Sequence, residues 1–174
     1  RVEVELPFVG AHQIGNLHLA LALARAAEGQ GWLRLEPDAV RRGVERARWP
    51  GRLTRHRIHG RDVLLDGAHN LEGVAALVDH LRRTGQRPNL LFSCLDDKPL
   101  EAMAVTLQAA VSRVAVCPLD DPRAMPVDRL AAVFPGCLVA SSPATGLDQL
   151  PDPVLAAGSL RLVGALLDAP PEEP

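Results

Sequence analysis

The residues of this chain that are best suited to chemistry fall in three short strings, HQIGN at 12–16, WPGRL at 49–53 and LLDGAHN at 64–70. In the last string a carboxylate, Asp66, and an imidazole, His69, flank two small residues that let a ligand approach the backbone. Arg52 follows a Pro-Gly turn, and its planar guanidinium offers a fork of donors suited to phosphate oxygens. The amide of Asn16 offers both a donor and an acceptor to the edge of a base. Together, these residue types suit the binding of a nucleotide.

Each string also has a purely structural interpretation. Asp66 and Asn70 are typical of residues that satisfy backbone donors in a strand-to-helix turn. An arginine in a Pro-Gly turn, such as Arg52, is typical of a surface salt bridge, and 12–16 fits the polar start of a helix. Residue type and spacing alone leave both interpretations open.

The elements that must position these residues follow from the apolar pattern after Gly51. We predict a hairpin from strands at 53–59 and 63–65, helices at 71–83, 99–111 and 127–134, strands at 89–95, 113–117 and 137–140, and a strand followed by a closing helix within 153–167. This alternation predicts an α/β fold with a mostly parallel, Rossmann-like sheet flanked by helices. Asp66 and His69 then lie at the carboxyl end of a strand and beside a helix N-terminus, where anionic ligands are favoured.

The first 50 residues predict too little structure for a domain of their own. A weakly alternating strand at 2–9 and a helix at 13–27 are followed by a second helix from about 36 to Arg48. We therefore interpret 1–50 as the end of a domain with a hinge, 51–168 as an independent α/β domain and 169–174 as a disordered tail.

Composition argues against several classes of protein. The net charge is −2, and the arginines between 41 and 61 are mixed with acidic residues without the aromatic residues that stack on bases, so no nucleic acid is expected. We find no apolar run that spans a membrane and no signal peptide, and we expect a cytoplasmic protein. The three cysteines, Cys94, Cys117 and Cys137, are expected to be buried free thiols rather than a disulfide or a metal site.

Taken together, the three strings resemble the folylpolyglutamate synthase/dihydrofolate synthase family, a branch of the Mur ligases. The resemblance continues in LFSCLDDK at 91–98 and in Gly-Ser-Leu at 158–160 followed by Val163-Gly164, so it spans nearly the whole chain. One difference is Leu71, where the family usually has proline. The resemblance implies that 51–168 is a Mur ligase C-terminal domain and that 1–50 is the remnant of the central ATPase domain.

The resemblance also implies roles for individual residues. ATP-binding positions are Asn16 at the adenine, Arg52 at the phosphates and Asp66 at the ribose. His69 and Ser159 are associated with the incoming glutamate. His69 is also the catalytic candidate, through orienting glutamate, and its action as a general base stays open.

The implied activity is that of an ATP-dependent acid–amino-acid ligase. It adds L-glutamate to dihydropteroate or a folate through an acyl phosphate, with ATP and Mg²⁺ as cofactors, and it acts as a monomer. The chain contains no G-x-x-x-x-G-K-[ST] string, so we expect the phosphate loop and the metal ligands to lie outside it. We therefore expect this chain alone to be catalytically inactive. Two alternatives remain: another Mur-type amino-acid ligase, or a non-catalytic α/β binding module.

Overall fold

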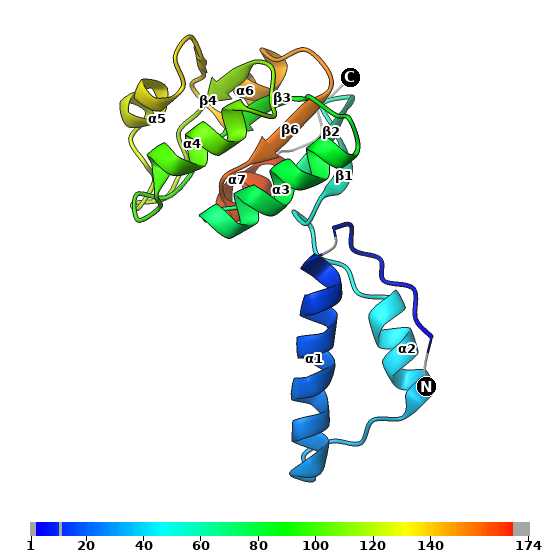
Figure 1. Cartoon of the computed structure of the whole chain (residues 1–174). Coiled ribbons are helices and arrows are strands. Elements are labelled where there is room, and N and C mark those ends of the chain that lie inside the picture. Colours follow the sequence, from blue (N-terminus) through cyan, green and yellow to red (C-terminus); the bar gives the residue numbers. More distant parts are fainter. Residues whose placement is uncertain (1–2, 11, 169–174) are drawn as a thin grey trace. The chain divides into compact units, whose positions relative to one another are not determined.

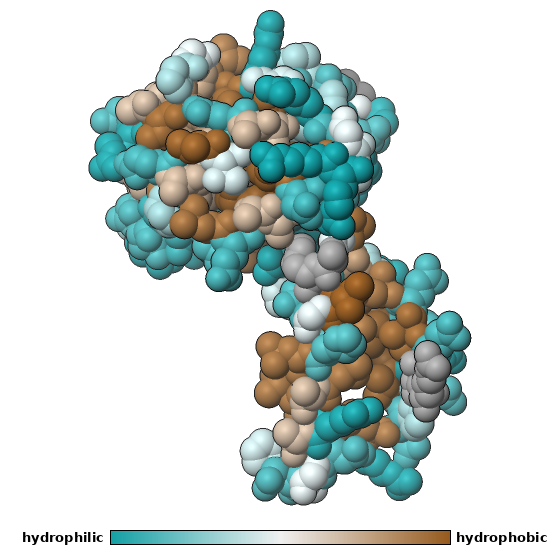
Figure 2. Space-filling model, in the orientation of Figure 1, coloured by the Kyte–Doolittle hydropathy of each residue, from teal (hydrophilic) through white to brown (hydrophobic). Residues whose placement is uncertain are grey.

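The computed structural model describes residues 3–10 and 12–168, which form two compact units that divide between Trp49 and Pro50 (Figure 1). The first unit holds two helices, α1 (His12–Gly29) and α2 (Pro37–Glu45). Most side chains of α1 are exposed, α2 buries none, and Figure 2 shows apolar surface over this unit. The first unit therefore has little core of its own.

Two predictions for the first unit were wrong in detail. In the strand expected at 2–9, residue 2 lies outside the described residues, and residues 3–9 are irregular and pair with no described strand, since an unpaired strand is not stable in water. The helix expected to reach Arg48 ends at Glu45, where the Arg48 guanidinium donates to the Glu45 carbonyl at 3.1 Å. The α1 helix was predicted correctly, with one or two more residues at each end.

The second unit is built on a six-stranded sheet in the order β1-β2-β6-β3-β4-β5. Its strands are β1 (Thr54–Ile58), β2 (Arg61–Asp66), β3 (Asn89–Phe92), β4 (Val114–Val116), β5 (Leu138–Val139) and β6 (Val154–Ala157). β1 runs antiparallel to β2 at one edge, and every other neighbouring pair is parallel. The predicted hairpin and mostly parallel sheet are thus confirmed.

Helices cover both faces of this sheet, as predicted. They are α3 (Leu71–Arg83), α4 (Leu100–Gln108), α5 (Val127–Val133), α6 (Pro143–Asp148) and α7 (Leu160–Leu167). The first three pack on one face around Leu90 and Phe92, and α6 and α7 pack on the other around Leu91. Successive residues of a strand point to opposite faces, so both faces of β3 are buried.

Several boundaries differ from the sequence-based expectation. β3 ends at Phe92 instead of Leu95, α4 ends at Gln108 instead of Val111, and β5 has two residues instead of four. The α6 helix was not predicted, although its start has a recognisable signal: Ser142 Oγ accepts the Thr145 N–H at 3.1 Å, and Pro143 occupies the first turn. Residues 169–174, the expected tail, lie outside the described residues.

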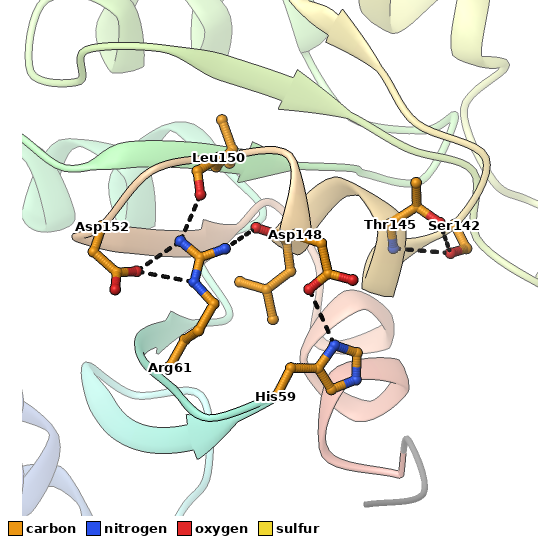
Figure 3. Close-up of polar contacts among 8 residues, drawn as sticks. His59, Arg61, Ser142, Thr145, Asp148, Leu150 and Asp152 are labelled. Atoms are coloured by element: carbon orange, nitrogen blue, oxygen red, sulfur yellow. Dashed lines mark hydrogen bonds and ion pairs between the residues drawn. The ribbon is translucent and has the colours of Figure 1, made fainter. Parts of the chain in front are cut away.

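One arginine ties the β1–β2 hairpin to the connection before β6 (Figure 3). The Arg61 guanidinium donates to the carbonyls of Leu147 and Leu150 and pairs with the Asp152 carboxylate at 2.6 Å. Beside it, His59 Nδ1 lies 3.2 Å from Asp148 Oδ1. These contacts lie at the amino end of β2, which leaves its carboxyl end free for a site.

Candidate functional site

Three neighbouring parallel strands end together at one edge of the sheet. Asp66 of β2 and Phe92 of β3 both align with Ala157, the last residue of the intervening strand β6. The segments that follow them therefore meet at this edge. Carboxyl ends of parallel strands are where open α/β sheets bind ligands.

The loop that carries Arg52 is attached to this edge on both sides of the arginine. The Gly51 carbonyl accepts the Gly67 N–H at 2.6 Å, and the Leu53 N–H donates to Asp66 Oδ2 at 2.9 Å. Arg52 itself is half-buried, and its guanidinium forms no hydrogen bond or ion pair with any residue that the structure describes. The backbone of Arg52 is thus fixed on both sides, and its guanidinium does not form the surface salt bridge that the purely structural interpretation predicts with any described residue.

Asp66 satisfies backbone donors and is almost fully buried, with 7% of its surface exposed. Besides the Leu53 N–H on Oδ2, its Oδ1 accepts the Ala68 N–H at 2.8 Å. The structural role expected for Asp66 is therefore present.

His69 has a defined tautomer in this arrangement. Its Nδ1 lies 2.8 Å from the Gly67 carbonyl oxygen, which only accepts, so Nδ1 carries the proton. In the neutral ring, Nε2 then keeps its lone pair for a ligand. The next residue, Asn70, caps α3 by accepting the Gly73 N–H at 2.8 Å, so Leu71 in place of proline leaves the helix start intact.

A cavity of about 230 Å³ brings two of the predicted site residues together. It is lined by His69, Leu95, Lys98, Ser159, Leu160 and Arg161. Lys98 belongs to a string noted in the sequence, but neither it nor Arg161 was among the predicted site residues. The structure thus adds two cations to the predicted pair of His69 and Ser159.

The Gly-Ser-Leu string has a structural explanation at each position. Gly158 has φ +110°, and a Cβ there would lie 2.4 Å from the Ser93 carbonyl oxygen, so only glycine lets β6 leave the sheet here. Ser159 caps α7 by accepting the Arg161 N–H at 3.0 Å, which leaves its hydroxyl proton available. Leu160 covers Gly67, where a Cβ would lie 2.3 Å from Leu160 Cδ2.

Asn16 belongs to the first unit and is described by itself. It is exposed on α1, and its Nδ2 donates to Gln13 Oε1 at 3.0 Å. This bond is the local polar contact that the helix-start interpretation predicts, and the carbonyl oxygen of the Asn16 amide takes no part in it.

The thiols do not contribute a nucleophile to this edge. All three cysteines are free; Cys94 and Cys117 are buried as expected, whereas Cys137 is partly exposed. Burial raises the pKa of both Cys94 and Cys117 to about 12, so they stay protonated near neutral pH. Within 3–10 and 12–168, no group of three His, Cys, Asp or Glu residues could hold a metal, and no helix is long and apolar enough to cross a membrane.

A larger cavity, of about 490 Å³, lies away from the predicted residues. Its lining includes Gln108 at the end of α4 and Arg113, Val114 and Leu138 at the amino ends of β4 and β5. Since ligands of parallel sheets collect at the carboxyl ends of strands, the smaller cavity is the better candidate site.

Comparison with known families decides how this edge of the sheet should be interpreted. Residues 51–160 match the family model described as Mur ligase, glutamate ligase domain. The chain belongs to this family. It is 33% identical over 171 residues to the folylpolyglutamate synthase of Lacticaseibacillus casei, a match covering 94% of this chain and 40% of that protein. It is 32% identical over 124 residues to the dihydrofolate synthase/folylpolyglutamate synthase of Bacillus subtilis, and this match covers 70% of this chain and 29% of that protein.

Solved structures of folylpolyglutamate synthases share the fold. A Mycobacterium tuberculosis folylpolyglutamate synthase complexed with ADP and AMPPCP is 29% identical with a TM-score of 0.79, and the match covers 97% of this chain and 43% of that one. A bifunctional folylpolyglutamate synthase/dihydrofolate synthase from Yersinia pestis, complexed with AMPPNP and Mn ion, is 26% identical with a TM-score of 0.78. This match covers 97% of this chain and 41% of that one. The resemblance to this branch is confirmed, and the chain spans less than half the length of these relatives.

Proposed function

We propose that this chain supplies the glutamate-binding part of an ATP-dependent ligase that joins L-glutamate to dihydropteroate or a folate through an acyl phosphate. The observation that carries the proposal is the cavity that joins His69, Lys98, Ser159 and Arg161 at the carboxyl edge of the sheet. In this proposal 51–168 is the ligase domain and 1–50 the end of the central ATPase domain. The free thiols fit a cytoplasmic location, since disulfides are rare in reducing compartments.

The polar groups of the cavity match the groups of free glutamate. Glutamate carries two carboxylates and one amine, and the cavity offers two cations, the hydroxyl of Ser159 and the imidazole of His69. The Ser159 hydroxyl donates to a carboxylate because its oxygen already accepts a backbone N–H. The N-terminus of α7, which begins at Leu160, adds partial positive charge.

His69 is proposed to act on the amine. With Nδ1 donating to Gly67, the Nε2 lone pair accepts a hydrogen bond from the glutamate nitrogen and orients it. As that nitrogen forms a bond to the acyl carbon, the bond from this carbon to the phosphate oxygen breaks and phosphate leaves with the electron pair. The proton lost by the nitrogen goes to Nε2.

The residues proposed to hold ATP fit a nucleotide by the chemistry of their side chains. Arg52 has a guanidinium that suits phosphate oxygens, Asp66 has a carboxylate that accepts hydrogen bonds from ribose hydroxyls, and Asn16 has an amide that suits the edge of adenine. ATP, when bound, supplies the phosphoryl group that activates the substrate carboxylate. We assign no ligand of Mg²⁺ to the described residues.

The test is ATP-dependent incorporation of labelled L-glutamate by the intact protein, which means the natural protein that contains this chain. The second substrate is dihydropteroate, tetrahydrofolate or a muramyl precursor. We expect incorporation into one or both pterin substrates and none into the muramyl precursor. His69→Ala should lower kcat by about a hundredfold, the usual range for one acid–base group. Arg113→Ala, in the larger cavity, is the matched control and should leave activity unchanged. Transfer to the muramyl precursor, or no transfer at all, would overturn the proposal.

A further inference from the structure

One cation of the cavity at the strand ends belongs to an ion pair whose two members differ sharply in exposure. Arg161 Nε lies 3.1 Å from Asp121 Oδ2. The Asp121 side chain is 5% exposed, whereas the Arg161 side chain is 65% exposed and lines the cavity. The pair therefore consists of a buried acidic anchor and a guanidinium that reaches the cavity.

Asp121 is held in place by its own loop. Its Oδ1 accepts the Arg123 N–H at 2.9 Å, and its carbonyl accepts the Ala124 N–H at 2.9 Å. The same loop is attached to the segment after β3, where the Met125 N–H donates to the Cys94 carbonyl at 2.9 Å. A carboxylate fixed in this way fixes the guanidinium that it binds.

The remaining donors of Arg161 are available to a ligand. Its Nε is used by Asp121, and its two terminal nitrogens form no hydrogen bond within the part of the chain that the structure describes. Lys98, the other cation of the cavity, pairs with Asp97 at 2.7 Å and is 21% exposed. Each cation of the cavity is thus positioned by an acid and keeps donors for one carboxylate of a ligand.

We infer that Arg161, positioned by Asp121, binds the side-chain carboxylate of the incoming amino acid and so selects glutamate over its neutral amide, glutamine. This inference rests on the proposed glutamate ligase activity. The α-carboxylate and the amine are common to all amino acids, so selection must come from a group that meets the side chain. Glutamine has an NH₂ group in place of one carboxylate oxygen. This group would either face the guanidinium donors of Arg161 or leave one of these donors unpaired, and both arrangements disfavour glutamine.

The experiment is steady-state kinetics of the intact protein with L-glutamate, and inhibition by L-glutamine, for Arg161→Gln, Arg161→Lys and Asp121→Asn. Because Arg161 is largely exposed, we expect Arg161→Gln to raise the KM for glutamate about tenfold, with kcat and the KM for ATP within about twofold of wild type. Inhibition by glutamine should stay unchanged or strengthen. Arg161→Lys should recover part of the loss.

Asp121→Asn should shift the glutamate KM in the same direction by a smaller factor. The double variant should be no worse than Arg161→Gln alone, because the two residues act as one unit. Arg123→Gln is the matched control, since its guanidinium also lies near Asp121, at 3.7 Å, but does not line the cavity. If Asp121→Asn does not fold, Arg161→Gln still decides the question, because its side chain is at the surface.

An unchanged glutamate KM in Arg161→Gln would overturn the inference while leaving the ligase proposal intact. Equal weakening of glutamate and glutamine would also overturn it, because that result would place Arg161 at the α-carboxylate. A wild-type protein that does not use glutamate would instead refute the underlying ligase proposal.

Discussion

The carboxylate of Asp66 accepts the backbone N–H of Leu53 at 2.9 Å, which joins two sequence strings thirteen residues apart. Leu53 is buried and has φ +51°, an unusual conformation for a residue with a side chain, so this bond holds a strained turn in place. The residue between the two anchors of this turn is Arg52. Asp66 therefore positions the cation that we propose to contact phosphate, whatever else it binds.

The first prediction concerns this bond. Asp66→Asn should lower the free energy of unfolding by about 1–3 kcal/mol, because an amide offers only one oxygen to the two backbone donors that the carboxylate accepts. It should also raise the KM for ATP, since the Arg52 turn loses an anchor. Urea denaturation and ATP kinetics measure the two effects. Unchanged stability would show that the bond does not hold the turn.

Arg52 gives the complementary prediction. Because its guanidinium forms no hydrogen bond or ion pair with a described residue, Arg52→Ala should change stability by less than about 0.5 kcal/mol. In the intact protein it should lower kcat/KM for ATP by about tenfold or more, with Arg52→Lys intermediate. ATP kinetics identical to wild type would remove Arg52 from the nucleotide site.

Gly158 should be intolerant of any side chain. Its φ of +110° and the 2.4 Å approach of a Cβ to the Ser93 carbonyl predict that Gly158→Ala costs about 2–4 kcal/mol of unfolding free energy. Gly164→Ala is the matched control in α7, where a Cβ meets nothing within 4 Å and should be neutral or stabilising by about 1 kcal/mol. Similar thermal midpoints for the two variants would contradict this account.

The buried thiols predict a pH dependence at alkaline pH. Burial raises the pKa of Cys94 and Cys117 from the ordinary 9.0 to about 12 in the folded state. Both thiols are protonated in the folded and unfolded states below pH 9, so their contribution to stability is complete there and is lost as pH rises from 9 to 12. A thiol reagent at pH 8 should label at most Cys137 in the native protein and all three cysteines in denaturant. Rapid native labelling of Cys94 would contradict the burial.

The sequence predicted the α/β fold because β3 and β6 are short apolar runs between amphipathic helices, a pattern that local periodicity reveals. The prediction of a strand was wrong at residues 3–9. Apolar and polar residues alternate there, but a strand needs a neighbouring strand, and no described residue supplies one. The six-residue α6 is too short for a helical period to be recognised.

Positions in the candidate site could be predicted only for residues that belong to one short sequence string. The DGAHN string predicts a strand, a turn and a helix, so the expected position of Asp66 and His69 between the carboxyl end of a strand and a helix N-terminus is confirmed. Arg161 and Asp121 are forty residues apart, and neither stands in a motif that marks it as functional. Their pairing depends on the order of strands in the sheet, which puts β6 beside β3 and β3 beside β4.

The proposed glutamate site is tested most directly by the KM for L-glutamate of the intact protein carrying Lys98→Ala. Lys98 is the less exposed of the two cations in the cavity, so its loss should leave one carboxylate of glutamate without a cation. We predict that the KM for glutamate rises about tenfold or more while the KM for ATP stays within about twofold of wild type. A glutamate KM equal to that of the wild type would contradict the assignment of this cavity as the glutamate site.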